Sequence, residues 1–125
     1  MLLKFVTNNI EFIVKTRETE TAKIITKNIP IISKINTWGD EIYFYTQLKP
    51  IKLEADSKDV FKLGEIAYWV DGNAIAIGFG PTPASKGKEI RLVSKCNRWG
   101  DAVNPSDLLK LKQSLDSDKI IVDLA

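Results

Sequence analysis

The run IAYWVDGNAIAI, residues 66–77, decides the fold. Two short apolar segments, residues 66–70 and 74–77, flank Asp71-Gly72-Asn73, and this tripeptide is typical of a tight turn because glycine and asparagine tolerate unusual backbone angles. Neither segment alternates cleanly between apolar and polar residues, so both faces of each strand are expected to be covered. The run therefore predicts a hairpin of two central strands.

Segments with a period of two extend this pattern in both directions along the chain. In residues 41–48, for example, Ile42 and Phe44 fall on one face and Tyr43 and Tyr45 on the other. Asn8-Asn9 predicts a two-residue turn between the first two strands. The expected strands cover residues 3–7, 10–14, 31–35, 41–48, 66–70, 74–77, 89–96 and 119–124.

Two segments change to a helical period. Residues 19–29 place apolar side chains at helical spacing, and Pro30 ends that pattern. Asn104-Pro105 starts a second short helix that is expected to reach about Leu115. About eight short strands and two helices, without strand–helix–strand alternation, predict a mainly β fold, a barrel or sandwich with helices at its ends.

Composition limits the chemistry more than the fold. The chain has 125 residues, a size typical of one domain covering residues 1–125, with a net charge of +2. It contains no histidine and a single cysteine, Cys96, which is expected to be a buried apolar residue. No metal site or cofactor is therefore expected. No membrane-spanning segment and no secretory signal are recognisable, which leads us to expect a cytoplasmic protein that does not contact membranes.

One pentapeptide pattern, N-x-W-G-D, occurs twice. It covers residues 36–40 and 97–101. Such a match can mark an old duplication or repeated turn chemistry, and the flanking residues do not align well enough to decide between them. We favour repeated turn chemistry.

Four segments, in this order, resemble the small bacterial and archaeal cyclophilin-like domain family, whose function is uncharacterised. They are NTWGDEIYF (36–44), LGEIAYW (63–69), GNAI (72–75) and FGPTP (79–83). The resemblance covers essentially the whole chain and implies a closed cyclophilin-like β-barrel, related to the peptidyl-prolyl isomerases but smaller. The chain lacks the Q-G-G-D element that accompanies the isomerase arginine, so no arginine is assigned that role.

Residue pairs that suggest nucleophilic or acid–base chemistry have simpler interpretations. Ser85-Lys86 lies in a polar loop, where adjacent side chains do not face one another. Asp40-Glu41 follows Gly39, and the pair is better read as turn chemistry than as a catalytic carboxylate pair. No catalytic residue is therefore predicted.

Aromatic and basic residues remain as candidates for binding. Five aromatic side chains lie in or beside the segments quoted above and could share an apolar pocket. Residues 86–100 carry five cations against one anion, and Arg91 with Lys95 could hold an anionic group, although a lysine-rich exposed strand that discourages edge pairing is the favoured explanation. The predicted ligand-binding residues are Trp38, Tyr43, Tyr68, Trp69, Phe79 and Arg91.

These observations predict a non-catalytic module that binds a small molecule or a proline-containing peptide in an aromatic pocket. Peptidyl-prolyl isomerisation is the alternative, because an arginine and an apolar pocket could serve it without acid–base groups. Nucleic-acid binding is less expected, since a net charge of +2 is modest for that class.

Overall fold

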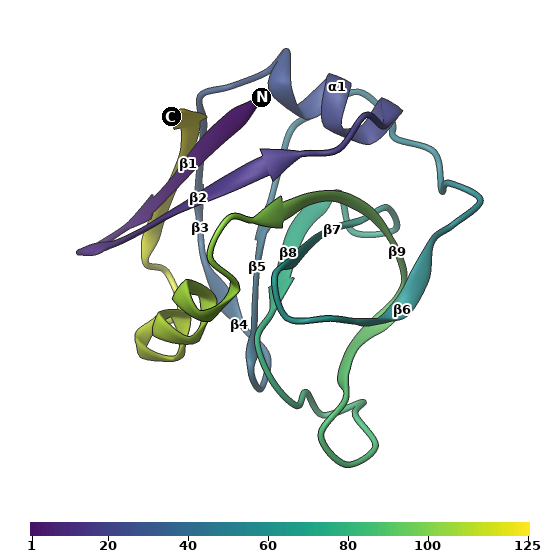
Figure 1. Ribbon diagram of the computed structural model, residues 1–125, viewed down its shortest axis with the longest axis vertical. Helices are drawn as coiled ribbons and strands as arrows, with labels where there is room; N and C mark the ends of the chain where they lie inside the picture. The colour runs from purple at the N-terminus through teal and green to yellow at the C-terminus, as the bar shows by residue number, and fades with distance from the viewer.

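Ten strands, one α-helix and one 3₁₀ helix make up the computed structural model, which describes residues 1–125 (Figure 1). In chain order the elements are β1 (Leu2–Thr7), β2 (Ile10–Thr16), α1 (Glu20–Thr26), β3 (Ile31–Lys34), β4 (Asn36–Thr37), β5 (Glu41–Tyr45), β6 (Lys58–Phe61), β7 (Glu65–Trp69), β8 (Ala74–Gly78), β9 (Ile90–Ala102), the 3₁₀ helix η1 (Pro105–Gln113) and β10 (Lys119–Leu124).

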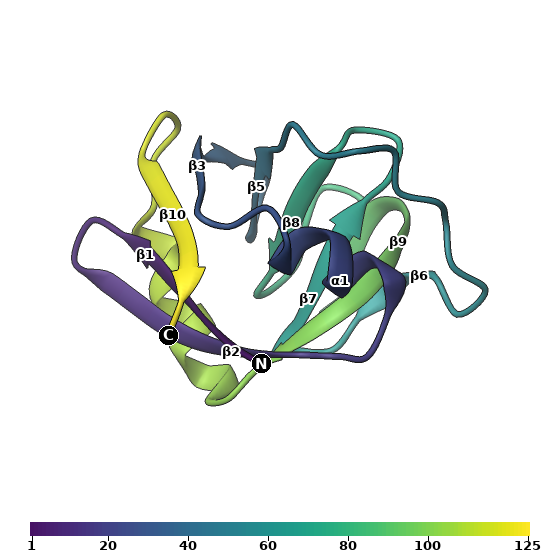
Figure 2. The same cartoon turned by 90° about the horizontal axis from the view of Figure 1, so that it is seen from above.

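Nine strands follow one another around a nearly closed barrel, in the order β3-β10-β1-β2-β9-β7-β8-β5-β4, and β6 pairs with β9 outside this path. The first and last strands of this order, β3 and β4, are consecutive pieces of one chain segment. The first piece pairs with β10 and the second with β5, so the two ends of the sheet meet there (Figure 2). The fold is therefore a mainly β, nearly closed barrel, as the sequence predicts.

The barrel interior is filled by alternate side chains of these strands. Phe5 stacks on Phe12 and on Trp99, with ring centroids 5.0 Å and 6.2 Å apart, and meets the edge of Phe44 at 6.5 Å. All four rings are buried. The indole Nε1 of Trp99 donates a hydrogen bond of 3.1 Å to the carbonyl oxygen of Ala67, which satisfies its one polar atom.

A second, smaller core covers the outer face of the hairpin formed by β7 and β8. Its buried members are Phe61, Ala67, Ala76, Leu92 and Cys96. The first half of β9, together with β6, lies over β7 and β8 and brings these side chains together. This covering explains why residues 66–77 are apolar on both faces, and it confirms β7 and β8 as central strands and Cys96 as buried.

The first helix is shorter than expected because its capping is local. Thr19 caps α1 by accepting a hydrogen bond from the backbone N–H of Ala22. At the other end Asn28 donates its side-chain amide to the Ile24 carbonyl, and the helix ends at Thr26 instead of Ile29. The second helix is a 3₁₀ helix that begins at Pro105 and buries Leu108 against the barrel.

The interpretation of N-x-W-G-D as two turns is wrong for the second copy. The first copy does turn, with Gly39 at a φ of 60° between β4 and β5. Residues 97–101 instead continue β9 beyond residue 96, where the strand was expected to end. They stay extended because Trp99 fills the barrel core and the buried Asn97 bonds the backbone of Lys52 and Glu54. The short strand β6 has no clear alternation and was not expected.

Neither α1, with seven residues, nor η1, with nine, has the length or the hydrophobicity of a membrane-spanning helix.

The Trp99 contact gives a test of the barrel core. Replacing Trp99→Phe should lower the free energy of unfolding by about 1–3 kcal/mol, because it removes a buried hydrogen bond and leaves a void beside Phe5. Urea unfolding followed by circular dichroism measures this loss. The control Val93→Ala, at an exposed position, should change stability by less than about 0.5 kcal/mol. Equal stabilities for the two variants would contradict the packing described here.

Candidate functional site

Three aromatic side chains form a row on the outer face of the barrel. Tyr43 and Tyr45 project from the same face of β5, and Trp69 projects from β7. The ring of Tyr43 meets Tyr45 at 5.8 Å and Trp69 at 6.1 Å, both edge to face. We call these three residues the aromatic row. Tyr45 is 53% exposed, so the row opens to solvent at that end.

Small residues beneath the row let its rings lie against the sheet. Ala74 of β8 pairs with both Tyr45 and Trp69, and Ala76 pairs with Tyr43. The Trp69 ring lies so close to Gly72 that a Cβ there would be 2.1 Å from it. Its Nε1 donates a hydrogen bond of 3.1 Å to Ser94 Oγ. The indole is therefore held in one position before any ligand arrives.

The other predicted aromatic residues lie elsewhere. Tyr68 and Phe79 are buried in the main core, and the hydroxyl of Tyr68 shares a hydrogen bond of 3.0 Å with Thr46 Oγ1. Trp38 lies in the turn after β4 and is half-buried. Of the five predicted aromatics, the structure thus brings only Tyr43 and Trp69 into ring contact, and it adds Tyr45.

Arg91, the predicted anchor for a ligand, is engaged by carboxylates. Its Nη1 lies 2.7 Å from Asp59 Oδ2, and its Nη2 lies 3.0 Å from Glu89 Oε2. Lys95 projects from the same face of β9 and is exposed. These contacts join the start of β9 to β6, which gives Arg91 a structural use in this strand pair.

A hollow beside Tyr45 lies at the joint between the two ends of the sheet. It has a volume of about 450 Å³ and is lined by Asn28, Pro30, Ile31, Ile32, Ser33, Tyr45, Thr46, Gln47 and Leu48. We call it the seam cavity. Its walls are the outer edges of β3 and of the segment that continues β5. The row therefore ends next to a space that can admit part of a ligand.

Glu41 is a buried acid that the sequence interpretation missed. It starts β5 on the same outer face as Tyr43, is 5% exposed, and its Oε1 has no hydrogen-bond partner. Burial raises the pKa of Glu41 to about 8, so the side chain is mostly neutral at pH 7. The strand period places Glu41 on that face, but its burial depends on parts of the chain that are distant in sequence.

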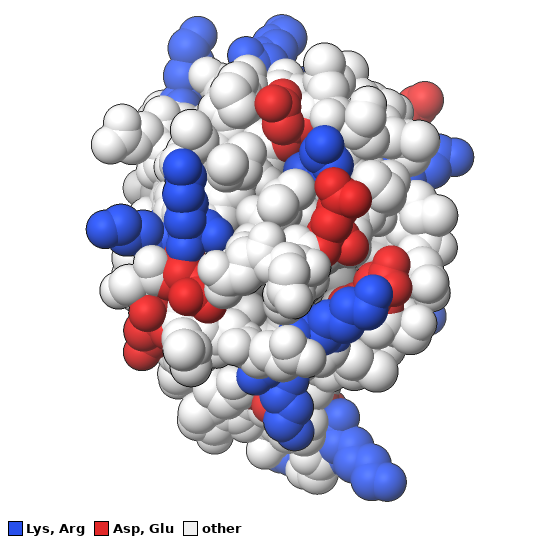
Figure 3. Space-filling view, turned by 90° about the vertical axis from the view of Figure 1, so that its left-hand side faces the viewer, with Lys and Arg blue, Asp and Glu red and all other residues white.

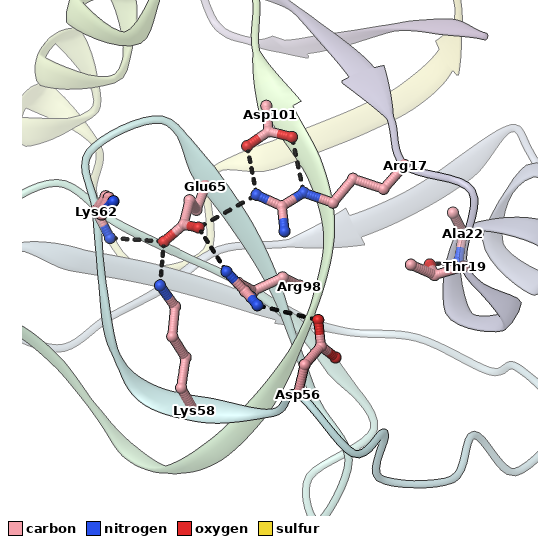
Figure 4. A network of polar contacts seen from close by, with 9 residues as sticks. All are labelled: Arg17, Thr19, Ala22, Asp56, Lys58, Lys62, Glu65, Arg98 and Asp101. Carbon is pink, nitrogen blue, oxygen red and sulfur yellow. Dashed lines mark hydrogen bonds and ion pairs between the residues drawn. The ribbon is translucent and has the colours of Figure 1, made fainter.

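A second polar cluster lies where β6, β7 and β9 meet the end of β2 (Figure 4). Glu65 is its centre. The carboxylate oxygens of Glu65 form ion pairs with Arg17 Nη2 at 3.2 Å, Arg98 Nη1 at 3.4 Å and Lys58 Nζ at 2.8 Å. The backbone N–H of Lys62 adds a bond of 2.8 Å. Burial by itself would raise the pKa of Glu65, but these donors, Lys58 foremost, outweigh it and lower the pKa to about 2.

Two further carboxylates complete this cluster. Asp101 accepts hydrogen bonds of 2.8 Å from both Nε and Nη2 of Arg17. Asp56 accepts one of 3.0 Å from Nη2 of Arg98. Three cations thus meet three carboxylates, and the charges balance. The cluster links the end of β2, residues 56–58, β7 and β9 to one another. Each of its cations is paired with a carboxylate and is therefore not free for a ligand.

Glu41 predicts an unusual dependence of stability on pH. Its pKa rises from about 4.5 to about 8 on folding, so the folded protein retains a proton that the unfolded chain releases. Its contribution to stability therefore falls as pH rises from 4.5 to 8. Glu41→Gln should abolish this fall and raise the free energy of unfolding at pH 8 by about 1–3 kcal/mol. Urea unfolding at several pH values measures it, and the exposed Glu11→Gln should reproduce the wild-type profile.

Glu65 predicts the opposite dependence. Its pKa falls from about 4.5 to about 2 on folding, so its stabilising effect is complete above pH 4.5 and is lost as pH falls toward 2. Glu65→Gln should lower the free energy of unfolding at pH 7 by about 1–3 kcal/mol and flatten the acid limb of the stability curve. The exposed Glu18→Gln serves as the control. An unchanged acid limb in Glu65→Gln would show that the cluster does not set the acid stability.

Comparison with known proteins agrees with this architecture. The Cyclophilin-like family model matches residues 1–123. The solution structure of the hypothetical protein AF2241 from Archaeoglobus fulgidus is similar over 100% of this chain and 95% of that one, with a TM-score of 0.82 and 40% sequence identity. A search of curated proteins found no match.

A more distant similarity concerns the fold alone. McbB, whose structure was determined in complex with tryptophan, matches 98% of this chain with a TM-score of 0.67 and 15% identity. This chain spans 44% of the McbB chain. The family match over nearly the whole length and the close similarity to AF2241 lead to one conclusion. The chain belongs to the Cyclophilin-like family.

Proposed function

We propose that this protein is a non-catalytic binding module that holds a small molecule or a proline-containing peptide against the aromatic row. The observation that carries the proposal is the edge-to-face contact of Tyr43 with both Tyr45 and Trp69 on an outer face of the barrel. Such rings bind flat ligands and proline residues through apolar contact, at little cost in side-chain entropy.

The fixed position of Trp69 supports this role. Its hydrogen bond to Ser94 and its packing on Gly72 hold one wall of the site, while exposed Tyr45 leaves the other end accessible. McbB, a protein of similar fold, is described in complex with tryptophan, and this makes indole compounds a reasonable first choice of probe.

The surrounding groups favour binding over catalysis. Each of the three arginines, Arg17, Arg91 and Arg98, is paired with carboxylates, so none is available to a proline carbonyl as isomerisation would require. Burial raises the pKa of the Cys96 thiol to about 12, which keeps it protonated and unreactive at neutral pH. We therefore prefer binding to peptidyl-prolyl isomerisation.

The face of the molecule at the left of Figure 1 does not carry the concentrated positive charge that nucleic-acid binding would need. Positive and negative side chains are interspersed there instead of gathering by sign (Figure 3). The net charge of +2 agrees with this picture.

The test is a titration of the labelled protein with L-tryptophan amide and with acetyl-tetraproline amide, followed by nuclear magnetic resonance. Saturable shifts at Tyr43 and Trp69 are expected, and Trp69→Leu or Tyr43→Leu should weaken binding at least about tenfold. Leu109→Ala, which changes an exposed side chain on η1, should leave the affinity unchanged. Absence of shifts at these residues with both ligands at about 10 mM would overturn the proposal.

A further inference from the structure

The barrel has one joint at which the ladder of backbone hydrogen bonds stops. β4 pairs with β5 only through Asn36–Tyr43 and Thr37–Ile42. Continued in the same register, the next bonded pairs would be Lys34 with Tyr45 and then residue 32 with residue 47. These pairs are not formed, because β3 pairs with β10 alone.

The backbone groups on both sides of this joint face each other across it. The N–H of Ile35 donates to Asp118 of the β10 side at 2.8 Å, so by alternation Ile32 and Lys34 direct their N–H and C=O groups away from β10. The N–H of Thr46 donates to Asn73 beside β8 at 2.8 Å, so Tyr45 and Gln47 direct theirs away from β8. Two unpaired strand edges therefore border the seam cavity.

One side chain crosses the joint. Ser33 Oγ donates a hydrogen bond of 2.7 Å to the carbonyl oxygen of Tyr45. Beyond it the cavity of about 450 Å³ opens between residues 30–33 and 45–48. A volume of this size holds a few residues of extended peptide, and the exposed side chains of Ile32 and Tyr45, 62% and 53% accessible, stand on either side of it.

The two segments that line the seam cavity carry charges of one sign only. Lys27, Lys34 and Lys49 are exposed and adjoin lining residues in the sequence. Residues 27–34 and 45–49 contain no aspartate or glutamate. Lys27, Lys34 and Lys49 form no ion pair, because the lysines that do so are Lys4, Lys58 and Lys110. An acidic partner would be attracted to this edge, while a basic one would be repelled.

We propose that the seam binds an extended, acidic peptide segment as an additional β-strand, whose backbone pairs with the unpaired groups of Ile32 and Gln47. Strand addition supplies affinity through main-chain hydrogen bonds, and the neighbouring lysines supply the preference for acidic side chains. This inference goes beyond the proposed function, because it assigns a second site beside the aromatic row and names the class of peptide that binds there.

The lysines have a competing explanation, since charged residues also discourage unwanted pairing of exposed edges. The two explanations differ in what an acidic strand does. If the lysines only protect the edge, a peptide that carries the opposite charge and β-branched residues gains no backbone pairing there.

The first experiment uses the wild-type protein and three peptides. The probe is acetyl-Glu-Val-Glu-Val-Glu-Val-amide; the controls are its lysine counterpart and a version methylated at the valine backbone nitrogens, which keeps the charge but loses ladder donors. The probe should slow amide exchange at residues 32 and 47 by at least about tenfold, and residues 31 and 33, already bonded to β10, should change little. Equal binding of the methylated peptide, or no added protection at residues 32 and 47, would overturn the proposal.

Variants then separate the seam from the aromatic row. Ile32→Pro removes the N–H that faces the cavity and leaves the hydrogen bonds to β10 in place, so it should lower the affinity for the probe at least about tenfold. Ile32→Val keeps that N–H and should bind the probe with wild-type affinity. Lys34→Glu with Lys49→Glu should weaken it similarly and reduce its salt dependence. Trp69→Leu should leave seam binding intact. Loss of probe binding in Trp69→Leu but not in Ile32→Pro would assign the peptide to the row and reject the seam.

Self-association is the remaining outcome. If sedimentation shows that the wild-type chain forms dimers that Ile32→Pro disrupts, the occupant of the edge is a second copy of the chain, and the acidic peptide is rejected as its ligand.

Discussion

Everything else in this molecule depends on the bend of β9. Its first half lies outside the hairpin of β7 and β8 and contributes Leu92 and Cys96 to the smaller core, while its second half enters the barrel wall and contributes Trp99 to the larger one. Gly100 permits the close approach that this path needs, because a Cβ there would be 2.7 Å from the side chain of Val14. One continuous strand thus joins two hydrophobic cores that would otherwise be separate.

The same bend determines which charged side chains meet at the end of the barrel and which are buried. Asp101 and Arg98, on the second half of the strand, meet Arg17 and Glu65 at the end of the barrel. Glu41 lies on the outer face of the sheet, where Leu92 and Cys96 of the first half pack, and is buried. β9 thus supplies Arg98 to Glu65, whose other cations are Arg17 and Lys58, whereas Glu41 has no ion partner.

Much of the fold could be predicted from the sequence because strand alternation and turn residues are local signals. The Asp71-Gly72-Asn73 turn, the two central strands and the buried Cys96 all follow from a few neighbouring positions. The long strand could not be predicted, because Asn97-Arg98-Trp99-Gly100-Asp101 carries turn-forming residues whose extended conformation is imposed by distant partners.

The candidate site could be predicted only in part, for a related reason. Aromatic residues were recognisable, but whether a ring faces inward or outward depends on which face of each strand is covered. The period of β5 separates Tyr43 from Phe44 correctly, whereas β7 is apolar on both faces and gives no such guide for Tyr68 and Trp69. The seam was not visible at all, since it arises where two strands fail to pair.

The interrupted joint has a mechanical consequence. A barrel whose hydrogen bonds are continuous around the circumference resists widening at every strand pair, but this one is a split ring. Beyond Asn36 the edges of β3 and of the segment after β5 can separate while all other strand pairs remain intact, and the resistance falls on the two pairs of β4 with β5, on the Trp38–Glu41 backbone hydrogen bond and on the Ser33 hydroxyl. Ile35 and Phe44, which lie next to the split and are now buried, would be the first interior side chains to meet water.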